Sequence, residues 1–265
     1  MLFRSDDAPL KQIAQVQVGA TFAEAHNEAG GVLFFVRQAT LMAQPFDAKA
    51  LTLAGEPVPV VQQIGLGRAH AHFSVTSSGI MAYRIGAGPL TQLTVADRAG
   101  ASLQKLGEPN KILTHSWSPD ESQVAIFRSE GTSNYDGDLW LLDLNRNVET
   151  RLTTGHKASV TNTNGPVWSQ DGKQLAFASG NSIMTKDVSG ATEARLIKDV
   201  GRAIPLVSDW TRDGRFLIYS PQDQPDIFAL PAAGGDPVAL LATPATEQGG
   251  AVSPDGHWLA YHSDQ

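Results

Sequence analysis

A recurring pattern limits the fold of this chain more than any other feature of its sequence. Each copy starts at an aromatic or apolar residue, passes through Ser-Pro-Asp-Gly or a close variant, and ends in a short apolar run. The copies cover residues 73–84, 117–128, 168–179, 210–221 and 252–263. Their first residues lie about 40 to 50 positions apart, which is the period of β-propeller blades.

Each copy predicts two antiparallel strands joined by a tight turn. Asp caps the turn, Gly adopts a positive φ, and Pro presets φ where it is present. The apolar run that follows has no polar alternation, which is typical of a strand covered on both faces. A second, weaker hairpin comes after each first one, as in Asp138–Asp143 and Thr150–Thr153. Two hairpins together predict one four-stranded blade.

The repeats predict an all-β fold, a six-bladed β-propeller with four antiparallel strands per blade and a single domain over residues 1–265. The last blade would be shared between the N-terminus and the C-terminus, which closes the ring and leaves no free sheet edge. The expected blades cover approximately residues 22–60, 72–106, 116–153, 167–197, 209–241, and 251–265 together with 1–15.

The composition excludes several classes of site and partner. The chain has no cysteine, so disulfides, thiolate nucleophiles and cysteine-based zinc sites are ruled out. Its net charge is −7 and no Lys/Arg cluster is present, which argues against a nucleic-acid partner. No apolar run approaches the ~18 residues of a membrane-spanning helix. We therefore expect no nucleic-acid or membrane partner. We also expect the protein to be a monomer.

The repeats and the strand pair at 138–153 together resemble those of the TolB-like propeller family. The stretches Leu41–Asp47, Gly55–Pro59 and Asp97–Gly100 are similar to those of a bacterial subgroup whose propellers are often fused to Ser/Thr kinase domains. The resemblance covers essentially the whole chain and implies a soluble bacterial propeller of the cytoplasm or the periplasm. It implies no single function, because this fold is used by scaffolds, sensors and hydrolases alike.

Polar residues stand where the chain is expected to enter the innermost strand of each blade. In a propeller these strands line the central channel, and the loops that enter them gather at one mouth. Four of the seven histidines fall at such positions in three consecutive blades. The channel-entry candidates are Glu24, His26, His70, His72, His115, Asn162, Asn164, Asp209 and Glu247.

One hypothesis is a divalent-metal site at the channel, with His26, His72 and His115 as ligands and His70 in reserve. Three imidazoles with an open position suit zinc, manganese or nickel. Such a metal lowers the pKa of a bound water and would support hydrolysis of esters, lactones or phosphoesters. Glu247 or Asp209 would act as the catalytic base. Calcium is disfavoured, because Asp136 and Asp138 lack the further acidic residues of an EF-hand loop.

The alternative is a non-catalytic scaffold or sensor propeller. It would bind a small molecule, a sugar, a peptide or a protein at the channel mouth, and Glu24, Asn162 and Asn164 would line the channel. The same polar residues would then hydrogen-bond to the backbone and to water. No Gly-x-Ser-x-Gly elbow is present, which disfavours a serine hydrolase. The sequence leaves the two hypotheses open.

Overall fold

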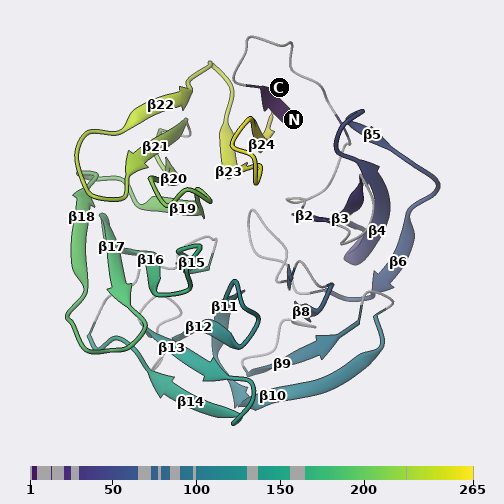
Figure 1. Ribbon diagram of the computed structural model, residues 1–265, viewed down its shortest axis with the longest axis horizontal. Coiled ribbons are helices and arrows are strands. Elements are labelled where there is room, and N and C mark those ends of the chain that lie inside the picture. The colour runs from purple at the N-terminus through teal and green to yellow at the C-terminus, as the bar shows by residue number, and fades with distance from the viewer. Residues whose placement is uncertain are drawn as a thin grey trace.

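A computed structural model describes residues 2–4, 13, 21–24, 30–64, 73–76, 79–83, 90–97, 100–129, 137–155, 165–224 and 226–264. All regular secondary structure in these residues is β-strand, and the strands form antiparallel sheets arranged around a ring (Figure 1). The protein is therefore an all-β propeller. Five of its sheets have at least four strands, and the remaining sheet has three.

The strands follow one another around the ring in chain order. Blade 1 consists of β2 (Thr21–Glu24), β3 (Gly31–Arg37), β4 (Thr40–Asp47), β5 (Thr52–Leu53) and β6 (Val58–Val61). Blade 2 consists of β7 (Phe73–Val75), β8 (Met81–Tyr83), β9 (Thr91–Ala96) and β10 (Ser102–Asn110). Blade 3 consists of β11 (Ile112–Trp117), β12 (Gln123–Ser129), β13 (Gly137–Asp143) and β14 (Val148–Arg151).

The second half of the chain repeats this arrangement. Blade 4 consists of β15 (Val167–Trp168), β16 (Gln174–Ser179), β17 (Ser182–Asp187) and β18 (Arg195–Asp199). Blade 5 consists of β19 (Pro205–Trp210), β20 (Phe216–Pro221), β21 (Ile227–Pro231) and β22 (Val238–Leu241). The three-stranded sheet joins β23 (Glu247–Val252) and β24 (Trp258–Ser263) to β1 (Leu2–Arg4).

The three-stranded sheet contains both ends of the described chain. Strand β1 pairs antiparallel with β24, and Leu2 lies opposite Ala260 in this register. The expected pairing of an N-terminal strand with the C-terminal hairpin is therefore confirmed for β1. The rest of residues 1–15, expected in the same blade, falls almost entirely outside the described residues.

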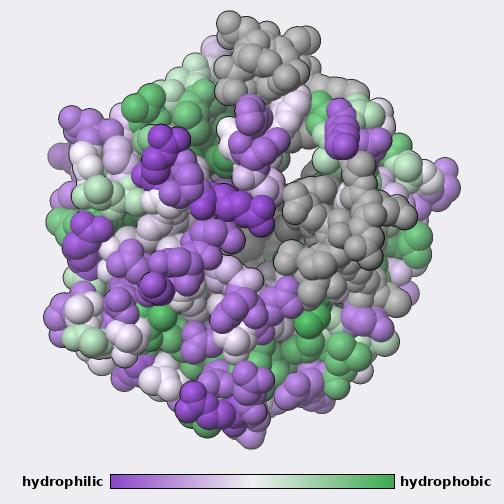
Figure 2. Space-filling model, viewed as in Figure 1, coloured by the Kyte–Doolittle hydropathy of each residue, from purple (hydrophilic) through white to green (hydrophobic). Residues whose placement is uncertain are grey.

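The first strand of each blade lies nearest the centre of the ring (Figure 1). Consecutive first strands contact each other from β2 to β7, β11, β15, β19 and β23. The last strands of the blades lie at the outer margin, where several aliphatic side chains are exposed. Figure 2 shows hydrophilic residues over much of the inner part of the viewed face and hydrophobic residues mainly towards its margin.

The repeated turns confirm the interpretation of the Ser-Pro-Asp-Gly pattern. In blade 3 the Ser118 hydroxyl donates to Asp120 Oδ1 at 2.6 Å and accepts the backbone N–H of Gln123 at 2.9 Å. The same two bonds recur in the pairs Ser169 and Asp171, Thr211 and Asp213, and Ser253 and Asp255. Each aspartate also accepts a backbone N–H two residues later. A four-residue pattern thus closes each hairpin locally.

Hydrophobic contacts between neighbouring sheets hold the blades together. Trp168 of blade 4 is buried in a cluster with Phe127 and Leu139 of blade 3. Trp210 of blade 5 packs in the same way against Ile183 of blade 4. Two of the tryptophans that start the repeats therefore pack between neighbouring blades. Within the part of the chain that the structure describes, no helix is long and apolar enough to cross a membrane.

Candidate functional site

Four of the channel-entry candidates lie on innermost strands in the structure. Glu24 ends β2, His115 lies in β11, Asp209 lies in β19, and Glu247 begins β23. The other candidates fall outside the described residues, and so does the side chain of Glu24. The candidates that lie wholly outside the described residues are His26, His70, His72, Asn162 and Asn164. No group of three or more His, Asp or Glu with metal-site spacing occurs among the described residues. The three-histidine metal site therefore stays a prediction.

His115 connects blade 3 to blade 2. Its side chain is 9% exposed, and its Nε2 lies 3.1 Å from the carbonyl oxygen of Ala82 in β8. Because a carbonyl can only accept, Nε2 carries the proton in this hydrogen bond. A metal bound at Nε2 would have to displace this contact.

Asp209 connects blade 5 to the three-stranded sheet. Its Oδ1 accepts the backbone N–H of Trp210 at 2.8 Å, and its Oδ2 accepts that of Val252 in β23 at 2.7 Å. Burial raises the pKa of this carboxyl to about 6, although both hydrogen bonds act to lower it. Such a pKa suits a general base near neutral pH. Both oxygens nevertheless already serve the contact between the two sheets.

Glu247 is deeply buried, with 1% of its surface exposed. Its Oε1 accepts a hydrogen bond from the Thr243 hydroxyl, while its Oε2 has no hydrogen-bond partner among the described residues. The pKa of the nearby Tyr261 is raised by burial and further by the negative charge of Glu247. The Oε2 of Glu247 can therefore accept a hydrogen bond from a water or bind a cation.

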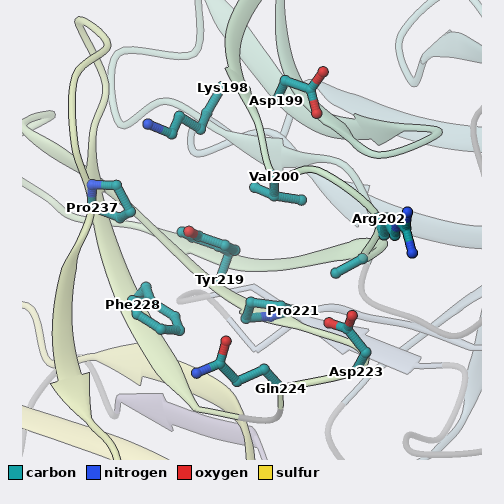
Figure 3. A pocket seen from close by; sticks show the side chains of 11 residues that line it. Lys198, Asp199, Val200, Arg202, Tyr219, Pro221, Asp223, Gln224, Phe228 and Pro237 are labelled. Carbon is teal, nitrogen blue, oxygen red and sulfur yellow. The ribbon is translucent and has the colours of Figure 1, made fainter.

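A pocket between blades 4 and 5 was not predicted from the sequence. Its volume is about 420 Å³, and strands of both blades and the loops that follow β18 and β20 contribute to it (Figure 3). Its lining residues are Lys198, Asp199, Val200, Arg202, Ala203, Tyr219, Pro221, Asp223, Gln224, Phe228 and Pro237. Aromatic and proline side chains form much of its wall, and charged groups stand around them.

Two aromatic rings form one side of this pocket. The ring centroids of Tyr219 and Phe228 are 5.6 Å apart, and the ring planes are inclined by 27°. Tyr219 is only 3% exposed, yet its hydroxyl makes no hydrogen bond with any described residue. Burial raises the pKa of this hydroxyl, so it remains a protonated donor at neutral pH. A donor without a protein partner at the wall of a pocket is available to hydrogen-bond a ligand.

The comparisons with known proteins agree on the fold. No protein-family model matches the chain, and no curated protein matches it in sequence. A structure described as a TolB from Agrobacterium tumefaciens is 19% identical, covers 88% of this chain and 86% of that chain, and has a TM-score of 0.62. TolB from Acinetobacter baumannii is 16% identical with a TM-score of 0.61, and the match covers 86% of this chain and 56% of that chain.

The same architecture also occurs in an enzyme. Hydrazine synthase from Kuenenia stuttgartiensis is 19% identical, with 87% of this chain and 70% of that chain covered and a TM-score of 0.56. At such identities the likeness shows the fold alone, which is that of the TolB-like propellers. The function has to be argued from the sites of this chain.

Proposed function

We propose that this chain is a ligand-binding propeller without catalytic chemistry of its own, and that the pocket between blades 4 and 5 is its binding site. The observation that carries the proposal is the Tyr219 hydroxyl, a donor without a partner among the described residues, at the wall of that pocket. By contrast, His115 and Asp209 are engaged in contacts between sheets.

The size and lining of the pocket support this role. Ligand pockets generally have volumes of roughly 300–1,000 Å³ and combine an apolar wall with a few polar groups. The volume of about 420 Å³ lies within this range. Pro221, Pro237 and Phe228 supply apolar surface, while Lys198 and Tyr219 supply donors. A small molecule, or one side chain of a peptide, would fit such a space.

A fragment screen against the wild-type protein, read by amide chemical shifts, tests the proposal. Fragments should shift the signals of Tyr219 and Phe228, and Val200→Phe should abolish these shifts by filling the pocket. Val148→Phe is the matched control, because Val148 is exposed on β14 in another blade. Fragments that bind Val200→Phe as well as the wild type would place the site elsewhere and refute the proposal.

A metal-dependent hydrolase is the second candidate, and one specific observation favours it. Glu247 is buried on an innermost strand with an oxygen that has no partner among the described residues, as a catalytic base or a further ligand would require. In this proposal His26, His72 and His115 bind zinc, manganese or nickel, and Glu247 or Asp209 activates the bound water on an ester, lactone or phosphoester.

Elemental analysis of the untagged protein after dialysis distinguishes the two candidates. The hydrolase requires about one metal ion per chain, a number set by the single three-histidine site. His115→Gln should then lose metal and ester hydrolysis while it keeps an amide donor for the Ala82 carbonyl. A chain that retains no metal after reconstitution contradicts this second candidate.

We further propose that the three-stranded sheet closes the ring as a sixth blade shared between the chain ends. The antiparallel register of β1 with β24 supports this, as do contacts of β23 with β19, β20 and β21. Removal of residues 1–4 should therefore speed amide hydrogen exchange in β24. Unchanged exchange at Leu259 and Ala260 would count against this closure.

A further inference from the structure

We infer that the pocket between blades 4 and 5 takes an organic anion in which a carboxylate is attached to a flat, apolar ring. This inference rests on the proposed function, because it names the class of ligand for the same pocket. Two parts of the pocket support it: an aromatic wall that fits a ring, and two donors that fit an anion.

The apolar part is built from the second and third strands of blade 5. Tyr219 on β20 and Phe228 on β21 stack against each other, and their rings offer a flat surface. Pro221 and Pro237 add rigid apolar edges. Aromatic rings prefer offset stacking or edge-to-face contact with other aromatic rings, so this wall favours a flat partner over a branched aliphatic one.

The anion-binding part consists of the Tyr219 hydroxyl and the Lys198 amine. Figure 3 shows the hydroxyl end of Tyr219 on the side of the pocket where Lys198 and Pro237 lie. A neutral phenol can only donate to a carboxylate, and an ammonium group has three protons to donate. Together they provide a charge-assisted site for a carboxylate.

Lys198 is held by a partner that a ligand can replace. Its Nζ lies 3.0 Å from Asp236 Oδ1, and its side chain is 29% exposed, whereas that of Asp236 is 99% exposed. An ion pair with such an exposed carboxylate contributes little, because water screens it and the side chain of Asp236 must be ordered. A ligand carboxylate that also receives the Tyr219 hydrogen bond would therefore compete successfully with Asp236.

The other charged residues at the pocket do not oppose this assignment. Asp199 and Asp223 are exposed, and Asp199 Oδ1 accepts the backbone N–H of Gly201 at 2.8 Å. Their charges are screened by solvent. Arg202 is also exposed, and its guanidinium has no ion pair or hydrogen bond among the described residues. The buried or partly buried groups that face the pocket are thus donors.

Two sources share this chemistry: a free aromatic acid, and a polypeptide that ends in an aromatic residue with a free carboxylate. Phenylacetate represents the first, and the peptide Gly-Gly-Phe represents the second. The matched neutral probes are phenylacetamide and the C-terminal amide of the peptide. Each pair keeps the ring and removes the charge.

Titration of the full chain, followed through the amide signals of Tyr219 and Phe228, tests the inference. We expect at least one anion to bind, and its neutral partner to bind about tenfold more weakly, as the loss of a charged hydrogen bond predicts. Tyr219→Phe and Lys198→Met should weaken the anion by a similar factor, while Asp236→Asn should strengthen it. Lys173→Met is the control, because Lys173 lies in a turn away from the pocket and is largely exposed.

The possible results separate the ligand class from the site itself. Preference for the peptide or for phenylacetate identifies the source, and both results support the inference. Equal binding of anion and amide, or an unchanged affinity in Tyr219→Phe and Lys198→Met, overturns the anionic class and leaves the site intact. Failure of both anions at millimolar concentration, with neutral fragments still bound in the pocket, overturns it as well. Loss of all binding at the pocket refutes the proposed function.

Discussion

The repeated hairpin turns and the inner end of blade 5 place the same residue type in opposite surroundings. In the turn of blade 5, the Thr211 hydroxyl and the backbone N–H of Arg215 lower the pKa of Asp213 to about 2. Four residues earlier, burial raises the pKa of Asp209 to about 6, although two backbone N–H groups donate to it. Hydrogen bonds dominate where water is near, and desolvation dominates where it is excluded.

The difference shows which contacts depend on the ring. The bonds of Asp213 all come from residues within its own turn, so they form whenever the hairpin forms. Asp209 instead accepts an N–H from Val252, which lies in another sheet. The turn aspartates therefore stabilise hairpins, and Asp209 stabilises the junction between blade 5 and the three-stranded sheet.

Replacing each aspartate by alanine should separate these roles most strongly. Asp209→Ala removes the acceptor of two backbone N–H groups at the junction, and we expect a loss of about 2–3 kcal/mol in the free energy of unfolding. Asp213→Ala should cost less than about 1 kcal/mol, because water can replace the lost bonds in an exposed turn. Urea unfolding at neutral pH measures both. Equal losses would show that Asp209 acts only within its own strand.

The pH dependence of stability should sharpen the comparison. The pKa of Asp209 is higher in the folded state than the usual value of 3.8, so the folded protein binds its proton more tightly. The contribution of Asp209 to the free energy of unfolding is present below pH about 4 and is lost as pH rises through about 6. We expect a fall of about 2 kcal/mol over this range, which is the order of magnitude that the pKa difference gives.

Asp209→Asn is the appropriate reference for this measurement, because it has nearly the same shape and no charge. The wild type should lose stability relative to Asp209→Asn between pH 4 and 6. Burial lowers the pKa of His262, which destabilises the fold as pH falls below the usual value of 6.5, but both proteins share that effect. If the curves of unfolding free energy against pH are parallel for the two proteins, the raised pKa of Asp209 does not affect stability and the prediction is wrong.

The smallest expected effect concerns the one repeat turn that departs from the glycine pattern. Glu121 occupies the position held by Gly172 in blade 4, and both have positive φ, 61° and 69°. A residue with a Cβ pays about 1 kcal/mol in this conformation. Glu121→Gly should therefore raise the free energy of unfolding by about 1 kcal/mol, and Gly172→Ala should lower it by a similar amount. Calorimetry measures both changes. If the two substitutions do not change the free energy of unfolding in opposite directions, this explanation is wrong.

Much of the fold could be predicted from the sequence because its causes are local. The Ser or Thr, Asp and Gly of each turn bond to one another within a few residues, and the apolar runs beside them mark strands covered on both faces. These features predicted the blades and the turns. The pairing of β1 with β24 followed from the incomplete hairpins at the two chain ends.

The candidate site was less accessible to this reasoning. Asp209, His115 and Glu247 lie on innermost strands, but their partners Val252, Ala82 and Thr243 could not be foreseen. Two of these partners, Val252 and Ala82, lie in other sheets. The sequence pattern of one blade does not indicate which carbonyl or N–H of another blade faces a given side chain. The histidines that would complete a metal site lie outside the described residues.

The sequence by itself determined the β-propeller architecture, because its period and turn chemistry repeat within each blade. The tertiary structure decided where a ligand has space to bind. Tyr219 belongs to an apolar strand that predicts only a core residue. It lines a pocket because Lys198 and Val200, from the preceding blade and the loop after it, border the same space. A cavity between two blades depends on how both surfaces meet, and neither stretch of sequence contains that information alone.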